Sequence, residues 1–244
     1  GTPVTSGTGS VDIDNTHPTL SSVSIVTDGD GDASNTDTVT LQFTTSEALL
    51  SNPTCTINDG DGNAMAGTVT VDNTNLVYSC TVTVADDDGD GTMSYSIAFT
   101  DAAGNVGTPV TSGTGSVDID NTHPAMTSVS ATDDAYGVGE TLTISVLYDS
   151  VVVVSGTPSL TLSNSATATY SSGSASNTLV FAYVVAEGDS DSTDLSVSSI
   201  TGTVNDEAGN AAGAVSANLG AVTVDGDAPD YLTSTATDGD YGVG

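Results

Sequence analysis

Apolar and polar residues alternate along many short stretches of the chain. Apolar side chains occupy almost every second position over residues 38–44, 76–84 and 92–99, and again over 141–148 and 178–185. Thr and Ser fill most of the positions between them. A period of two places successive side chains on opposite faces of an extended strand, and β-branched Thr suits strands better than helix interiors. Clusters of Gly, Asp, Asn and Ser separate the stretches and favour turns. The pattern predicts β-strands and no amphipathic helix.

The sequence repeats itself with a period of about one domain. Residues 1–18 and 107–124 carry the same letters, GTPVTSGTGSVDIDNTHP, and the DAAGN of residues 101–105 recurs as DEAGN at 206–210. Seven or eight strands in roughly 105 residues is the number expected for an immunoglobulin-like β-sandwich. We therefore predict an all-β fold of tandem immunoglobulin-like β-sandwich domains in a linear array.

The phase of the repeat predicts the domain boundaries. Residues 1–16 match the C-terminal tail of a preceding repeat, residues 17–122 and 123–228 each form one sandwich, and residues 229–244 match the start of a following repeat. The alternative is a two-domain protein with ragged ends. We favour the array, because eighteen identical letters do not fit an unstructured arm.

All charged side chains that are permanently ionised at neutral pH are acidic. The chain has 244 residues with Lys plus Arg 0 and Asp plus Glu 32, which gives a formal net charge of -32. No cation is available to neutralise phosphate, so we expect no nucleic acid partner and no polybasic contact with a membrane. The longest bulky apolar run, residues 151–154, is far shorter than the roughly 20 residues of a transmembrane helix. Any cation that stabilises the fold must come from outside.

The acidic residues point to a hard cation. Only four of the 32 are Glu, and the Asp residues gather in Gly-rich turns. A short carboxylate lets a loop fold around an ion, and Ca²⁺ takes six to eight oxygen ligands in flexible geometry, whereas Mg²⁺ tolerates irregular cages poorly. We therefore expect Ca²⁺ as the cofactor. For any single cluster, a solvated acidic turn is the alternative.

Three kinds of cluster supply the candidate metal ligands. The junctions between repeats contain Asp12, Asp14, Asp118, Asp120, Asn121, Asp225 and Asp227. The turn after the first strand of each domain and its flank contain Asp28, Asp30, Asp133, Asp134 and Glu140. The D-x-A-G-N turns contain Asp101, Asn105 and Asp206. If these groups meet at one pole of a sandwich, an ion there would tie the end of one domain to the start of the next.

A further run, Asp86, Asp88 and Asp90, matches the first half of an EF-hand loop, D-x-D-x-D-G. The twelfth position is Ile97 instead of Glu, so the run is not an EF-hand. A turn of this kind between strands could still bind Ca²⁺ with ligands from elsewhere in the fold.

Cys55 and Cys80 are the only cysteines, and each lies on the apolar phase of its strand. A disulfide between them would close a loop of about 25 residues and stabilise the fold by roughly 3–4 kcal/mol. It would also fit an oxidising, extracellular compartment. The alternative is two buried free thiols. His17 and His123 share one repeat position before Pro, and we interpret them as linker residues. With two linker histidines and no Lys, we predict no enzyme.

The second domain contains Gly139–Ile144 (GETLTI), Val154–Leu162 (VSGTPSLTL) and the DEAGN turn, and it resembles the bacterial Ig-like repeats of large surface adhesins and swimming-motility-type proteins. The first domain, with FTTSE at 43–47 and FTDAAGN at 99–105, is similar to a sister family. The resemblance implies an extracellular, often Ca²⁺-rigidified spacer at the cell surface. Residues 147–150 depart from the usual F-S-E/D sequence, which leaves the role of Asp149 open.

Together these features predict a non-enzymatic structural spacer of a large extracellular surface protein, as an adhesin stalk, filament or surface-layer component. Ca²⁺ at the domain junctions would rigidify it. The expected partners are neighbouring repeats of the same chain, with self-association into a filament or lattice as a second expectation. The alternative function is a module that binds carbohydrate or a host surface, for which Tyr136 and Tyr241 are the repeated aromatic candidates.

Overall fold

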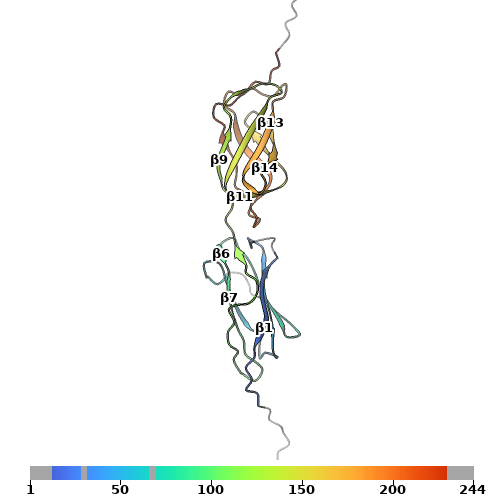
Figure 1. The fold of residues 1–244 in the computed structure, drawn as a ribbon, viewed down its shortest axis with the longest axis vertical. Coiled ribbons are helices and arrows are strands. Elements are labelled where there is room, and N and C mark those ends of the chain that lie inside the picture. Colours follow the sequence, from blue (N-terminus) through green and yellow to red (C-terminus); the bar gives the residue numbers. More distant parts are fainter. Residues whose placement is uncertain (1–12, 29–31, 66–69, 230–244) are drawn as a thin grey trace, which may run out of the picture. The chain divides into compact units, whose positions relative to one another are not determined.

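The computed structural model describes residues 13–28, 32–65 and 70–229 (Figure 1). The chain divides into two compact units. Unit 1 comprises residues 1–123 with 207–210, and unit 2 comprises residues 124–206 with 211–244. The described residues contain no helix that could span a membrane.

Unit 1 is built from two packed layers of strands. One layer is a four-stranded sheet in the order β1-β2-β5-β4, and the other centres on the antiparallel pair β3–β7, to which Val110 adds two backbone bonds with Ile97. A short pair, β6–β8, lies at the end of the unit. The bounds are β1 (Leu20–Thr27), β2 (Thr38–Thr45), β3 (Thr54–Asn58), β4 (Thr70–Thr74), β5 (Val77–Thr83), β6 (Gly91–Thr92), β7 (Ser94–Ala98) and β8 (Asp118–Ile119). This order is the A-B-E-D and C-F-G arrangement of an immunoglobulin-like sandwich.

Unit 2 has a similar strand order but joins the strands into one connected sheet, because two of its strands pair across the layers. The long strand β11 takes the place of both β2 and β3: residues 141–147 pair with β13, and residues 153–162 pair with β14. Its partner β9 takes the place of β1. The bounds are β9 (Met126–Ala131), β10 (Ala135–Tyr136), β11 (Thr141–Leu162), β12 (Thr167–Ser172), β13 (Ser176–Val184), β14 (Ser196–Asn205), β15 (Ala217–Asn218) and β16 (Thr223–Val224).

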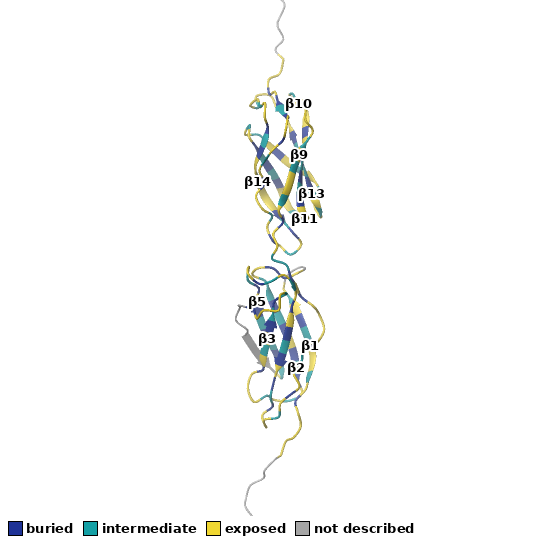
Figure 2. Cartoon of the chain, turned by 90° about the vertical axis from the view of Figure 1, so that its left-hand side faces the viewer, coloured by how far each residue is buried: buried dark blue, intermediate teal, exposed yellow. Residues whose placement is uncertain are grey.

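Each unit has its own apolar core between its layers. Buried and exposed positions alternate along β2 and β13 as the sequence pattern predicts (Figure 2). Phe43 stacks on Tyr78 in unit 1, with ring centroids 5.7 Å apart, and Phe181 meets the edge of Tyr170 in unit 2 at 5.9 Å. The predicted fold class, tandem immunoglobulin-like β-sandwiches without helices, is confirmed.

The two layers of unit 1 are also joined covalently. Cys55 on β3 forms a disulfide with Cys80 on β5, with a Cα–Cα distance of 6.5 Å. The bond links a strand of one layer to a strand of the other, so it lies across the core. The predicted pairing of these two cysteines is present.

Candidate functional site

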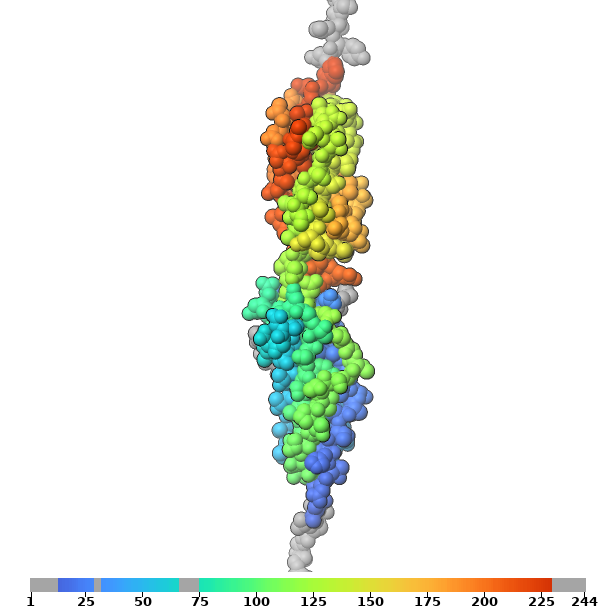
Figure 3. All heavy atoms as spheres, turned by 60° about the vertical axis from the view of Figure 1, so that its left-hand side comes forward, coloured from blue at the N-terminus to red at the C-terminus, as the bar shows by residue number. Residues whose placement is uncertain are grey.

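Three carboxylates meet at the N-terminal end of unit 1. Asp14 precedes β1, Glu47 follows β2 and Asp101 follows β7, and one oxygen of each lies within 4.8 Å of the others. Asp101 is fully buried, Glu47 is half-buried and Asp14 is exposed. In Figure 3 the blue start of the unit lies against the green segment that contains the D-x-A-G-N turn. We call this group the first triad.

The D-x-A-G-N turn folds around the carboxylate of Asp101. The backbone N–H groups of Ala103 and Asn105 donate to Oδ1 at 2.9 and 2.8 Å, and the Asn105 side chain donates to Oδ2 at 2.8 Å. The same amide reaches the backbone carbonyl of Asp14 at 3.1 Å, which fixes the segment entering the unit. Desolvation raises the pKa of Asp101, but the hydrogen bonds from Asn105, Ala103 and Gly104 outweigh it and hold the pKa below its usual 3.8.

Glu47 is the least favourably placed carboxylate of the first triad. Desolvation, followed by the negative charges of Asp14 and Asp101, raises its pKa above the usual 4.5. The charge of an ionised Glu47 is therefore less favourable in the folded unit than in water. Because the chain has no Lys or Arg, no side chain of those two types offsets the three carboxylates.

A second triad lies at the C-terminal end of unit 2. It comprises Asp191, in the loop after β13, and Asp225 and Asp227, which follow β16, and all three are exposed. The backbone N–H of Gly226 donates to Asp191 Oδ1 at 2.9 Å, and that of Asp227 donates to Asp225 Oδ1 at 3.0 Å. These bonds hold residues 225–227 beside the loop that contains Asp191, so that the three carboxylates lie close together.

The corresponding place in unit 1 is filled by an amide. Asn121 donates from its side chain to the carbonyls of Ala85 and Asp88, at 2.9 and 3.0 Å. Asp90 accepts from the Asn121 N–H at 2.7 Å and from the Thr122 hydroxyl at 2.5 Å. The D-x-D-x-D-G loop is thus closed by hydrogen bonds, although the buried Asn121 Oδ1 has no hydrogen-bond partner among the described residues.

Most other candidate ligands accept hydrogen bonds from backbone or hydroxyl groups, some within their own turn and some from a neighbouring segment. Asp28, Asp88, Asp120, Asp133, Asp134 and Glu140 each accept a backbone N–H, and Asp118 accepts the hydroxyl of Thr92. Among the described residues, none of these joins a group of three carboxylates. Asp86 is exposed and Asp206 is buried. Asp12 and Asp30 lie outside the described residues.

Asp14 and Asp101, candidate ligands from two different predicted clusters, lie together in the structure, as do Asp225 and Asp227. Glu47 and Asp191, which complete the two triads, are not among the predicted ligands. Glu47 stands just beyond a predicted strand, at the same end as the D-x-A-G-N turn. Asp191 stands where the repeat places Asp90 of the D-x-D-x-D-G run. Aligning the two loops would have found it.

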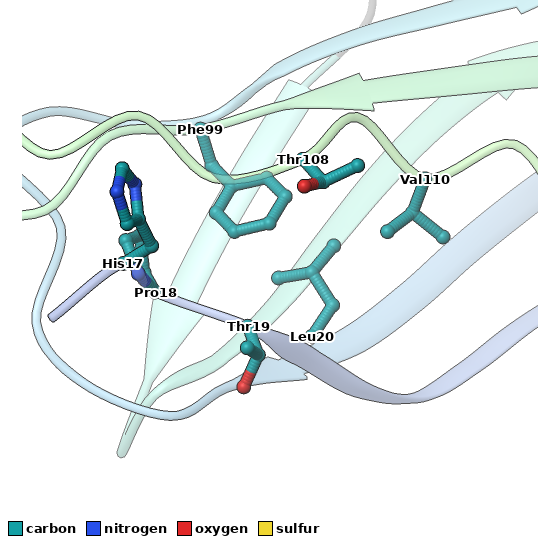
Figure 4. A pocket seen from close by; sticks show the side chains of 7 residues that line it. All are labelled: His17, Pro18, Thr19, Leu20, Phe99, Thr108 and Val110. Carbon is teal, nitrogen blue, oxygen red and sulfur yellow. The ribbon is translucent and has the colours of Figure 1, made fainter.

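The histidine and tyrosine residues considered in the sequence lie outside the two triads. His17 places Nδ1 2.8 Å from the Val106 carbonyl, beside a cavity of about 250 Å³ lined mainly by apolar groups, among them Phe99 and Leu20 (Figure 4). Tyr136 packs against the core of unit 2, and its hydroxyl donates to the Thr132 carbonyl at 3.2 Å. Tyr241 lies outside the described residues.

The sequence matches no protein-family model and no curated protein. Among solved structures, it is similar to a tetra-tandem repeat in the extending region of a large adhesion protein, with 20% identity over 84% of this chain and 50% of that chain, and a TM-score of 0.32. The D00-D0 domain of intimin matches with 13% identity over 81% of this chain and 98% of that chain, and a TM-score of 0.31. A glucan-utilisation protein from Bacteroides ovatus, SGBP-B, has 21% identity, coverages of 80% and 42%, and a TM-score of 0.21. Similarities at these scores carry no argument about function.

Proposed function

We propose that the chain is a non-enzymatic spacer of a large extracellular surface protein, in which Ca²⁺ bound at the two triads stiffens the joints between successive repeats. The observation that carries the proposal is the composition of the triads. Each combines a carboxylate from a junction segment, Asp14 or Asp225, with one from a loop of the unit, Asp101 or Asp191. An ion held by both parts would fix the angle at which the chain enters or leaves that unit.

Electrostatics favours an ion at these places. Three carboxylates within 4.8 Å of one another repel, and at Glu47 this repulsion adds to desolvation, the larger cause, in raising the pKa. The three side chains of a triad offer up to six oxygens, and backbone carbonyls and water complete the six to eight that Ca²⁺ takes. The first triad has the Asp14 carbonyl close by, already ordered by Asn105.

The disulfide and the charge support an extracellular location. A bond such as Cys55–Cys80 persists in oxidising compartments. Extracellular Ca²⁺ modules work with dissociation constants of about 10⁻⁴–10⁻³ M. A chain without Lys or Arg also offers no site to trypsin-like proteases. Residues 1–16 and 229–244 would belong to adjacent repeats of the same array.

Thermal unfolding of the full chain in 10 mM CaCl₂ and in EGTA tests the proposal. For dissociation constants of about 10⁻⁴–10⁻³ M, binding to the folded state alone adds about 1.4–2.7 kcal/mol per site. Small-angle X-ray scattering should give a narrower range of molecular dimensions with Ca²⁺ than with EGTA. MgCl₂ at equal ionic strength is the control. Identical unfolding curves and identical scattering in all three buffers would reject the proposal.

A further inference from the structure

Strand β9 lies at an open edge of unit 2. It runs along the edge of the unit in Figure 1 and faces the viewer in Figure 2. It pairs with β11 on one side, and within residues 124–229 no strand pairing or isolated bridge joins its other side to another segment. An unpaired side of this kind presents a row of backbone donors and acceptors to which a further strand can bond.

The register shows which backbone groups face the open side. The Glu140 carbonyl accepts from the Val185 N–H at 3.0 Å, so in this part of β11 the even-numbered residues bond to β13 and the odd-numbered residues bond to β9. One of these odd-numbered residues is paired with Ser130. The backbone N–H and C=O groups of its neighbours, Val129 and Ala131, therefore point away from β11.

Unit 1 covers the same edge with its own chain. The Ile25 N–H donates to the Thr114 carbonyl at 3.0 Å, and the Val23 carbonyl accepts from the Thr114 N–H at 2.8 Å. Val23 and Ile25 stand on β1 where Val129 and Ala131 stand on β9. The two groups that are covered in unit 1 are thus the ones that face the open side in unit 2.

The final segment of unit 2 is held on the other layer. Leu219, at the repeat position of Thr114, donates its N–H to the Leu195 carbonyl at 3.0 Å, and its side chain is buried in the core. Ala217, two residues earlier, pairs with Val197 on β14. The segment is therefore bound to β14 and leaves the edge of β9 uncovered.

β9 lacks most of the features that protect edge strands. Charged side chains, Pro and bulges discourage pairing at such edges. Residues 126–131, MTSVSA, contain no charge and no Pro, and the register shift lies at the start of the strand. Val129 and Ala131 are half-buried, whereas Ser128 and Ser130 are exposed. An added strand would place apolar side chains beside the first pair and polar ones beside the second.

Exposed acidic residues flank the open edge at both ends. Asp149 accepts the Ala125 N–H at 2.9 Å at the start of β9, and Asp133 and Asp134 follow its end. A second copy paired antiparallel on β9 would bring Asp149 of one chain toward Asp133 and Asp134 of the other, and each chain has a formal net charge of -32. Such like charges oppose association. A strand with Lys or Arg at both ends would match them, and these 244 residues contain neither.

We propose that the open edge of β9 binds an extended, basic segment of a partner protein by strand addition. The segment has uncharged residues opposite residues 128–131 and Lys or Arg on both sides of them. The backbone groups of Val129 and Ala131 supply the pairing, and Asp133, Asp134 and Asp149 select the charge. This docking role is additional to the spacer function and requires no Ca²⁺.

Amide hydrogen exchange of the full chain in EGTA tests the open edge directly. The probe is the synthetic peptide Lys-Lys-Thr-Val-Thr-Val-Thr-Val-Lys-Lys. Without the peptide, the Ala131 N–H should exchange about tenfold faster than the Ile25 N–H, and saturating peptide should slow the exchange of Ala131 about tenfold. Ile25 is the internal control, because Thr114 already covers its N–H, and the peptide should leave its exchange unchanged.

A proline variant tests the pairing itself. Ala131→Pro removes the outward donor without removing a bond to β11, and it should weaken peptide binding about tenfold in fluorescence anisotropy. Calorimetry checks that unit 2 still melts cooperatively in this variant. If it does not, the exchange of Ala131 and Ile25 in the unaltered chain decides the question.

Charge variants separate a local match from general attraction to an acidic chain. Asp133→Asn with Asp134→Asn and Asp149→Asn should weaken binding of the peptide at low salt. The matched control removes the same charge from exposed residues of unit 1, by Asp61→Asn with Asp86→Asn and Asp87→Asn, and should bind as the unaltered chain does.

Four results would overturn the proposal. They are equal binding of a peptide with Glu in place of Lys, unchanged binding by a folded Ala131→Pro variant, an equal loss of binding in both charge variants, and no effect of the peptide on the exchange of Ala131. Protection of the Ala131 N–H that rises with the concentration of the chain alone would identify a second copy as the occupant and would also reject it.

Discussion

Units 1 and 2 share a strand order but join their two layers by different means. In unit 1 the chain leaves one layer at the end of β2 and re-enters the other at β3, and the Cys55–Cys80 disulfide crosses the core. In unit 2 the single strand β11 serves both layers, with a register shift between Leu147 and Val152. Unit 2 thus joins its layers by continuous backbone, and unit 1 joins them by a covalent cross-link between β3 and β5.

The difference has a physical cause in the loop sequences. Residues 46–53 of unit 1 include Asn52-Pro53, and Pro cannot donate to a sheet ladder, so β3 begins after it. Residues 149–154 of unit 2 include four consecutive valines, which favour an extended chain. The unit with a broken connection has the cross-link, and the unit without cysteine has the unbroken strand.

The largest expected effect is the loss of a central aromatic side chain. Phe43 in unit 1 and Phe181 in unit 2 are fully buried. Replacing either with Ala should destabilise its own unit by about 3–5 kcal/mol through lost burial and a cavity. Calorimetry with each variant should show one transition lowered and the other unchanged. A shift of both transitions by either variant would show that the units do not unfold independently.

Removal of the disulfide should come next and should affect only unit 1. The bond closes a separation of 25 residues, which corresponds to about 3–4 kcal/mol on the chain-entropy model. Cys55→Ala with Cys80→Ala, or dithiothreitol on the unaltered chain, should lower the unit 1 transition. Unit 2, which has no cysteine, is the internal control. Equal sensitivity of both units to dithiothreitol would contradict the comparison.

A smaller difference in stability is expected from the residue that follows β2 in unit 1 and its counterpart in unit 2. Glu47 stands two residues beyond Thr45, the partner of Leu20, whereas Ser150 stands two residues beyond Tyr148, the partner of Met126. Ser150 therefore stands at the position of Glu47, and the neighbouring Asp149 accepts the Ala125 N–H at 2.9 Å and joins no group of three carboxylates among the described residues. Because its pKa is raised, ionised Glu47 opposes folding above its pKa when no metal is bound, and this penalty disappears as the pH falls below about 4.5.

Glu47→Gln should accordingly raise the unit 1 melting temperature in EGTA at pH 7, with little change at pH 4. In CaCl₂ the sign should reverse, because a ligand is lost. Asp87→Asn, at an exposed residue outside both triads, is the matched control. A variant that behaves like this control in both buffers would remove Glu47 from the site.

The smallest expected effect is a loss of stability of unit 2 at alkaline pH. Burial, with the carboxylate of Asp189 at 2.7 Å, raises the pKa of Tyr183 to about 12. The folded state holds this proton more tightly, so the stabilisation is complete below the ordinary value of 10 and is lost as the pH rises toward 12. Tyr183→Phe should remove a tyrosinate absorbance step near pH 12. An unchanged high-pH titration would contradict the assignment.

Local periodicity in the sequence was enough to predict the strands and the disulfide. Alternation located the strands around Leu41 and Phe181, and the phase of Cys55 and Cys80 predicted their pairing. The periodicity did not predict that two strands join into the single strand β11, because the run of valines at residues 151–154 shows no alternation. Glu47 could not be predicted as a member of the first triad, because its partners come from distant segments that only the three-dimensional fold brings together. Asp191 could be predicted only by aligning its loop with the D-x-D-x-D-G run of unit 1.

The central claim is that the two triads bind Ca²⁺, and direct titration of the metal tests it. Isothermal titration or equilibrium dialysis of the metal-free full chain should give two sites, and about one should disappear in Glu47→Gln and about one in Asp227→Asn. The Asp87→Asn control should keep both. Weak binding that scales with total charge and is equal in all four chains would contradict the claim.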